Sequence, residues 1–237
     1  MALILVGCEE SQAITIALRK LGHEAFSCDL LPCSGGHPEW HYQQDIFEVI
    51  KLKKWDMMIA HPPCTFLTNS AVQWLSHPED KHLPFEQRRP HPKYPNRRQD
   101  MLESVEFVKA LYNCKIPLVV IENPMGLLST RFRKPDQIIQ PWMFGDEATK
   151  TTCLWLKGLP LLIPTKIVGK GERTIFKSGK SHPKWYADAL ATAKTPAERR
   201  TLRSKTFQGI ADAIALQWGE YVVTCRLSNE NHLINVQ

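Results

Sequence analysis

Two short motifs place a possible nucleophile and a possible acid in the same chain. Cys64 follows Pro62 and Pro63 directly after one apolar run, and Glu122 and Asn123 follow another. A cysteine thiolate can add to C6 of a cytosine ring, which makes C5 nucleophilic enough to accept a methyl group. A carboxyl group on the opposite edge can stabilise the charge that develops at N3. We therefore predict that Cys64 and Glu122 act on one base.

Apolar strands that alternate with amphipathic helices position these motifs. The pattern predicts strands over residues 2–6, 24–30, 55–60, 118–121 and 152–156, and helices over residues 11–21, 46–52, 98–111 and 207–218. Such an alternation favours a parallel-rich sheet, whose ligands bind at the carboxyl ends of the strands. We expect an α/β, Rossmann-like fold with Gly7, Asp29, Cys64 and Glu122 on one rim.

The length and composition of the chain fit one domain. A sequence of 237 residues with 43% hydrophobic residues can bury the core of one α/β domain. We assign residues 1–223 to this domain and residues 224–237 to a tail. Residues 76–98 are rich in proline, histidine, lysine and arginine, which predicts a loop beside the active site. Its histidines, at positions 77, 82 and 91, are interpreted as loop residues rather than metal ligands.

Positive charge is concentrated late in the sequence. The net charge is +6, yet residues 1–75 hold 5 Lys/Arg against 8 Asp/Glu, whereas residues 161–205 hold 11 Lys/Arg against 3 Asp/Glu. The basic residues are interspersed with the aromatic residues Phe176, Trp185 and Tyr186. This composition suits contact with a phosphate backbone. We predict that the basic segment, residues 157–205, contacts nucleic acid rather than forming only a solvated surface.

Apolar runs and cysteines indicate the compartment. The longest apolar runs fall well short of the ~20 residues of a membrane span, and the N-terminus has no signal-peptide pattern. Seven irregularly spaced cysteines favour a reducing compartment, so we expect a cytoplasmic protein that has no membrane contact. A zinc site is disfavoured, because one of its ligands would have to leave a predicted strand. Its candidate ligands are Cys28, Cys33, His37 and His41.

The two motifs, in this order along the chain, resemble those of a known enzyme family. Pro62-Pro63-Cys64 and Glu122-Asn123 are similar to the catalytic motifs of the DNA cytosine-5 methyltransferases. The resemblance extends over about residues 3–156, and residues 144–150 and 203–218 look similar to small phage-borne and bacterial members. It implies that Cys64 is the nucleophile, that Glu122 is the acid at the base edge, and that Asn123 supports the Glu122 loop.

The same resemblance implies S-adenosylmethionine as the cofactor. Gly7 corresponds to the first glycine of the methionine-binding turn, and Asp29 would bind the ribose hydroxyls. Leu30 would pack on the adenine face, with Asp45 and Ile46 beside the ring. A carboxylate about twenty residues after the first turn binds a ribose in Rossmann folds as well. The expected cofactor contacts are Gly7, Asp29, Leu30, Asp45, Ile46 and Pro62.

The sequence departs from the family pattern in three places. Cys8, Glu9, Glu10 and Ser11 replace the usual glycine-rich turn, and the arginine-rich motif is not visible, although Lys150 is a possible substitute. Only about 48 residues, 157–204, stand where relatives carry a large recognition domain. We expect DNA as the partner, single or double stranded, a short target context, and no protein partner. The expected nucleic-acid contacts are Lys150, Lys177, Lys180, Lys184 and Arg203.

Three alternatives remain open at this level. A methyltransferase acting on an exocyclic amino group would carry an aromatic residue after the Pro-Pro turn, where this chain has Cys64. A non-catalytic, nucleic-acid-binding relative would tolerate the bulkier turn after Gly7. A methyltransferase acting on free cytosine nucleotides would not need a recognition domain, but it would not need the basic segment either.

Overall fold

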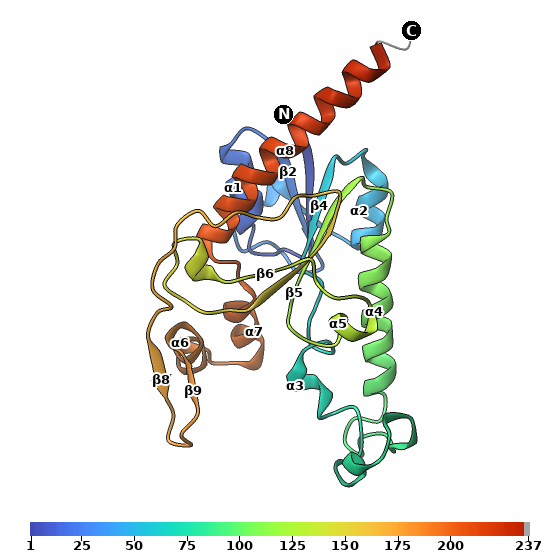
Figure 1. Cartoon of the computed structure of the whole chain (residues 1–237), viewed down its shortest axis with the longest axis vertical. Coiled ribbons are helices and arrows are strands. Elements are labelled where there is room, and N and C mark those ends of the chain that lie inside the picture. Colours follow the sequence, from blue (N-terminus) through green and yellow to red (C-terminus); the bar gives the residue numbers. More distant parts are fainter. Residues whose placement is uncertain (235–237) are drawn as a thin grey trace.

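A seven-stranded sheet forms the central layer of the computed structural model, which describes residues 1–234 (Figure 1). Its strand order is β3-β2-β1-β4-β5-β7-β6. The five strands from β3 to β5 pair in parallel, and β7 pairs antiparallel with both neighbours. The predicted α/β, Rossmann-like fold with a parallel-rich sheet is confirmed. The strands are β1 (Leu3–Gly7), β2 (Glu24–Asp29), β3 (His41–Gln43), β4 (Met57–Ala60), β5 (Leu118–Pro124), β6 (Gln137–Ile139) and β7 (Thr152–Lys157).

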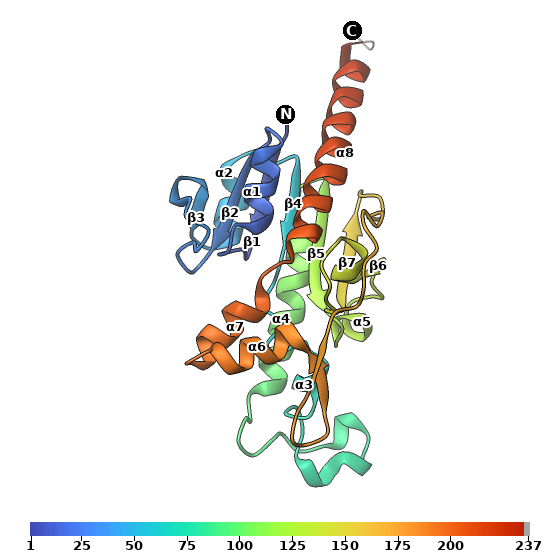
Figure 2. The same ribbon diagram turned by 90° about the vertical axis from the view of Figure 1, so that its left-hand side faces the viewer.

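Helices cover both faces of the sheet. One face packs against α1 (Ala13–Lys20) and α8 (Gln208–Ile234), and the other against α2 (Ile46–Leu52) and α4 (Arg97–Tyr112) (Figure 2). Successive side chains of a strand point to opposite faces. The apolar runs of the central strands therefore supply both cores at once, as expected for a buried parallel sheet.

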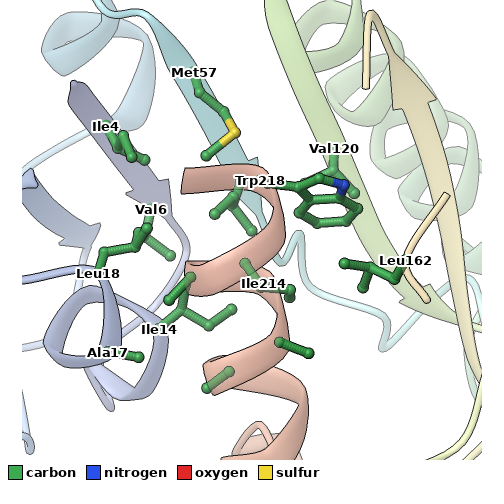
Figure 3. Packing of buried hydrophobic residues seen from close by; sticks show 14 of the residues in the cluster. Ile4, Val6, Ile14, Ala17, Leu18, Met57, Val120, Leu162, Ile214 and Trp218 are labelled. Atoms are coloured by element: carbon green, nitrogen blue, oxygen red, sulfur yellow. The ribbon is translucent and has the colours of Figure 1, made fainter. Parts of the chain in front are cut away.

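The core beside α1 and α8 is built around Trp218, which is fully buried. Its Nε1 donates a hydrogen bond of 2.9 Å to the carbonyl oxygen of Pro160. Ile14 of α1 and Ile214 of α8 meet Val6 in the same cluster (Figure 3). Burial of each large apolar side chain contributes roughly 1.5–3 kcal/mol to folding.

The last helix is longer than predicted. The sequence pattern indicated a helix over residues 207–218, whereas α8 begins at Gln208 and ends at Ile234. Residues 224–234 of the predicted tail therefore continue this helix, and residues 235–237 lie outside the described part of the chain. Within residues 1–234 no helix is both long and apolar enough to span a membrane.

The basic segment, residues 157–205, folds into a hairpin and two helices. The hairpin consists of β8 (Arg173–Ile175) and β9 (Ser181–Pro183), and it leads into α6 (Lys184–Thr192) and α7 (Pro196–Ser204). This hairpin and the loop of residues 76–98 project from the same end of the molecule, away from both termini (Figure 1). The remaining short elements are α3 (Asn69–Val72), α5 (Leu128–Arg131) and 3₁₀ turns at Pro38–Trp40, Pro78–His82, Phe85–Gln87 and Pro141–Met143.

Arginine side chains hold the loop of residues 76–98 in place. Arg89 forms an ion pair of 2.7 Å with the buried Asp80, which holds the pKa of this carboxyl well below its usual value. Arg98, at the start of α4, donates to the carbonyl oxygens of Leu75 and Arg88 at 2.8 and 2.7 Å. The segment predicted as a loop thus has short 3₁₀ turns and fixed anchors.

Candidate active site at the carboxyl edge of the sheet

The strand register places the predicted site residues along one edge. Gly7 is level with Cys28 and Ala60 on the neighbouring strands, and Ala60 is level with Ile121. The next residues along these strands are Asp29, His61 and Glu122. β1 lies between β2 and β4, where the strand order reverses, and a ligand of an open α/β sheet binds at such a point.

Asn123 joins the Pro62-Pro63-Cys64 turn to the Glu122-Asn123 motif. Its Nδ2 donates a hydrogen bond of 2.8 Å to the carbonyl oxygen of Pro62, and the side chain is buried. The turn after β5 also packs directly on the chain after Cys64, since a Cβ on Gly126 would lie 2.0 Å from the Leu67 carbonyl oxygen. Asn123 therefore supports the turn that carries Cys64 as well as the strand that carries Glu122.

His61, which the sequence analysis did not single out, contacts Glu122. Its Nδ1 lies 3.1 Å from Glu122 Oε2, and both side chains are largely buried. Burial by itself would raise the pKa of Glu122, but the hydrogen bond and charge of His61, together with the charge of Lys150, hold this pKa below its usual value. The sequence feature that could have identified His61 is its position, directly after β4 and directly before Pro62.

Cys64 lies half-buried within the electrostatic reach of three charged side chains. Burial and the charge of Glu122 raise the pKa of its thiol, and the cations Arg203 and Lys150 partly oppose this rise. At rest the group is a neutral thiol, and the two cations would favour its thiolate form during a reaction. The structure thus brings the predicted nucleophile, the predicted acid and two predicted nucleic-acid contacts together.

Lys150 lies inside this site rather than on the outer face of the basic segment. Its Nζ donates to the carbonyl oxygens of Ser204 and Lys205 at 3.4 and 3.0 Å. The same atom lies 6.0 Å from the ring centroids of both Trp185 and Phe207. Burial lowers the pKa of this ammonium, and the nearby acidic groups act against that effect. Lys150 therefore links the end of α7 to the catalytic motifs.

Of the predicted cofactor residues, Pro62 lies in the turn that carries Cys64, and the other five lie toward β2 at the other end of the edge. The Ile46 side chain packs directly on Gly7, since a Cβ there would lie 2.1 Å from Ile46 Cδ1. Asp29 accepts a hydrogen bond from the Leu31 amide at 2.9 Å, and Asp45 caps α2. Burial and the charges of Asp29, Cys28 and Asp45 raise the pKa of Cys8, so both carboxylates face the turn after β1. Leu30 is 72% exposed beside them.

Two polar side chains that the sequence analysis did not assign shape the turn after β1. Glu9 is buried, and its carboxylate accepts hydrogen bonds of 2.7 Å from both the Ile14 amide and the Thr15 hydroxyl at the start of α1. Gln12 holds the loop after β2 through two bonds to the His37 backbone, of 2.8 and 3.1 Å. Cys8 and Gln12 both have positive φ, 57° and 58°, where glycine is usual.

The candidate zinc ligands are engaged elsewhere. The His37 ring stacks on Trp40 with centroids 3.8 Å apart, and His41 Nε2 lies 2.9 Å from the Leu31 carbonyl oxygen. In the described part of the chain, no three His, Cys, Asp or Glu side chains are grouped as metal ligands would be.

The remaining predicted nucleic-acid contacts lie on the hairpin and on α6 and α7. Lys177 and Lys180 are exposed in the turn between β8 and β9. Lys184 pairs with Asp188 at 3.4 Å, and the Arg203 guanidinium lies 4.6 Å from the Tyr186 ring centroid. The predicted contacts thus divide into an inner pair, Lys150 and Arg203, and an outer group of three lysines.

Comparisons with known proteins give distant likenesses to solved structures and no other match. No family model and no curated protein matches the chain. A crystal structure from E. coli, provisionally assigned as a DNA modification methyltransferase encoded within a prophage, is similar with 13% identity and a TM-score of 0.40. The similarity covers 71% of this chain and 52% of that chain, so it spans about half the length of that protein. This likeness identifies no family, and no residue role follows from it.

Proposed function

We propose that the protein is an S-adenosylmethionine-dependent DNA methyltransferase that modifies cytosine at C5 through a covalent adduct with Cys64. The observation that carries the proposal is the hydrogen bond from Asn123 to the Pro62 carbonyl. It fixes the thiol-bearing turn to the strand that carries Glu122. A base inserted between the two loops would meet a nucleophile and a carboxyl group in one crevice.

The chemistry follows from these two groups. The Cys64 thiol loses its proton, and the sulfur forms a bond to C6 of the cytosine while the ring electrons move toward C5 and N3. Glu122 in its protonated form donates a hydrogen bond or proton at N3. S-adenosylmethionine, when bound, supplies the methyl group in electrophilic form. Loss of the C5 proton to a base, return of the N3 proton to Glu122 and departure of the Cys64 thiolate from C6 then restore the aromatic ring, with S-adenosylhomocysteine as the second product.

His61 orients Glu122 and influences its protonation. Its Nδ1–H donates to Glu122 Oε2, so the carboxylate cannot rotate freely about its last bond. Glu122 is ionised in the free protein, because its pKa lies below the usual value. Glu122 must therefore gain a proton before it can act as an acid. In this scheme His61 is a positioning residue.

The residues at the cofactor end suit an adenosyl group without phosphates. Backbone amides at the start of the first helix bind phosphate in many nucleotide-binding folds, but here the Glu9 carboxylate occupies them. Asp29 and Asp45 offer acceptors for ribose hydroxyls, and exposed Leu30 offers an apolar surface for a base. This donor and acceptor set fits S-adenosylmethionine and disfavours a dinucleotide.

Two basic projections support DNA as the substrate. The β8–β9 hairpin and the loop of residues 76–98 project from one end of the molecule (Figure 2). The strands β1, β2, β4 and β5 run parallel, so their carboxyl ends share one edge of the sheet. Lys177 and Lys180 on the hairpin are exposed and can approach a phosphate backbone without crossing the crevice.

Product analysis tests the proposal. The full-length protein is incubated with labelled S-adenosylmethionine and single-stranded DNA, double-stranded DNA or free cytosine nucleotides, and the nucleosides are then separated. We expect 5-methylcytosine from DNA, no product with Cys64→Ala, and normal product with Cys114→Ala, which removes another half-buried thiol. DNA that contains 5-fluorocytosine should trap the wild-type protein covalently. An active protein that is never trapped would overturn the Cys64 mechanism.

A further inference from the structure

A cavity lies between α6, α7 and residues 205–207, which lead into α8. Its volume is about 410 Å³, which falls within the range of small-molecule sites. α6 contributes most of one wall, and the stretch between α7 and α8 contributes the other. The lining residues are Trp185, Asp188, Ala189, Thr192, Leu202, Lys205, Thr206 and Phe207.

Two aromatic rings form a corner of this cavity. The rings of Trp185 and Phe207 are nearly perpendicular, at 89°, with centroids 5.5 Å apart. Trp185 Nε1 donates a hydrogen bond of 3.0 Å to the Thr149 carbonyl oxygen, which fixes the indole. A flat heteroaromatic ring can stack on one face of this corner while its edge meets the other ring. Stacking on a fixed aromatic side chain is how proteins bind single-stranded bases.

The polar wall of the cavity accepts hydrogen bonds. Asp188 and Thr192 follow Trp185 by three and seven residues, so the three side chains share one face of α6. The Thr192 hydroxyl donates to the Asp188 carbonyl oxygen at 2.8 Å, which uses its only proton. The Asp188 carboxylate faces Lys184 at 3.4 Å and retains free lone pairs. Guanine is the base that presents two adjacent N–H donors, N1 and N2, to such a carboxylate.

The cavity adjoins the catalytic crevice. Thr206 and Phe207 line it, and they also line a narrow pocket whose other walls include His61 and Glu122. Lys150 lies between the two spaces, since its Nζ bonds to the Lys205 carbonyl and it lines the narrow pocket as well. A strand with one base at Cys64 would therefore bring an adjacent base to this cavity, with Arg203 and Lys205 near its phosphates.

We propose that this cavity binds a guanine base adjacent to the target cytosine, through stacking in the Trp185–Phe207 corner and hydrogen bonds to Asp188. The proposal rests on the proposed function, since it assumes that a nucleic-acid strand enters the crevice. It assigns base readout to the basic segment, residues 157–205, and to the residues that lead from it into α8.

The test replaces the guanine beside the target cytosine by hypoxanthine, which lacks only the N2 amino group. Single-turnover methylation is measured on matched single-stranded oligonucleotides with the full-length protein and with Asp188→Asn. Loss of one hydrogen bond to a carboxylate should lower the wild-type rate constant at subsaturating DNA about tenfold. Asp188→Asn should show less than about a twofold difference between the two oligonucleotides. Asp212→Asn on α8 removes a carboxylate outside the cavity and should behave as wild type.

A binding measurement separates failure of this inference from failure of the proposed function. The affinity for the same two oligonucleotides is measured by fluorescence anisotropy, in which no methyl transfer is needed. If nothing is methylated but the wild type binds the guanine oligonucleotide about tenfold more tightly and Asp188→Asn does not, the cavity assignment stands and the activity fails. Equal affinity and equal rates for guanine and hypoxanthine in the wild type, or unchanged discrimination in Asp188→Asn, overturn the cavity assignment.

Discussion

Asn123 Nδ2 donates a hydrogen bond of 2.8 Å to the carbonyl oxygen of Pro62, and this bond connects β5 to the turn after β4 across 61 residues of sequence. Asn123 is buried, so the bond is shielded from water. The turn that carries Cys64 is therefore held in a fixed position relative to Glu122. The His61–Glu122 contact and the Leu127 amide bond to the Leu67 carbonyl, of 2.7 Å, hold the same two segments together.

Asn123→Ala should lower the rate of methylation strongly while lowering the stability of the folded protein only moderately. Leaving the buried Pro62 carbonyl without a partner costs about 1–3 kcal/mol, so urea unfolding should shift to lower denaturant while the protein remains folded. Since the cysteine turn loses its anchor, we expect the single-turnover rate of methylation to fall about tenfold or more. A variant with wild-type turnover would show that the bond is dispensable for catalysis.

The His61–Glu122 pair makes the free energy of unfolding depend on pH in the acid range. The pKa of Glu122 is held below its ordinary value of 4.5, so the pair stabilises the folded state above that pH, and this stabilisation is lost as the pH falls through the lowered pKa. His61→Ala should remove this contribution. We expect the unfolding free energies of wild type and variant to differ near neutral pH and to converge at low pH.

The His61→Ala variant should also change the pH dependence of catalysis. Without His61, burial acts on Glu122 with less opposition, and the pKa of Glu122 should rise. The pH profile of kcat should therefore move, while affinity for S-adenosylmethionine stays constant. His61→Asn keeps an N–H donor near the Nδ1 position. It should restore part of the orientation of Glu122, but its pH profile should remain shifted, as in His61→Ala. A profile that is the same in all three proteins would limit His61 to a structural role.

Asp29→Ala should weaken binding of S-adenosylmethionine. Hydrogen bonds between a carboxylate and ribose hydroxyls contribute about 1.5–3 kcal/mol each, so affinity should fall on the order of tenfold to a hundredfold in calorimetry. Glu48→Ala removes an exposed carboxylate from α2 and serves as the matched control. Equal affinity for wild type and Asp29→Ala would remove Asp29 from the cofactor site.

Neutralising Lys177, Lys180 and Lys184 together should weaken binding to DNA of every sequence. Each phosphate contact contributes about 0.7–0.9 to the slope of log affinity against log salt, so the slope should become shallower in the variant. Cofactor affinity should not change. A control variant neutralises three exposed lysines at the opposite edge of the sheet, Lys20, Lys51 and Lys54. Identical slopes for the wild type and the hairpin variant would place the DNA elsewhere.

Local sequence patterns were sufficient to predict most of the helices and strands. The apolar run that ends at Ala60 and the one that begins at Leu118 form neighbouring parallel strands, as predicted. Both runs are continuous because both faces of a parallel sheet are buried. The short edge strands β3 and β6 have no such run, and the antiparallel pairing of β7 depends on strands far away in sequence. These features were not predicted.

The sequence alone determined the order of the motifs, the strand ends near Gly7 and Asp29, and the late excess of positive charge, whereas β5 continues past the predicted end at residue 121 to Pro124. Only the tertiary structure decided that His61 contacts Glu122 and that Lys150 turns inward. Those contacts join side chains from different strands and loops, and their partners are set by register and packing rather than by local periodicity.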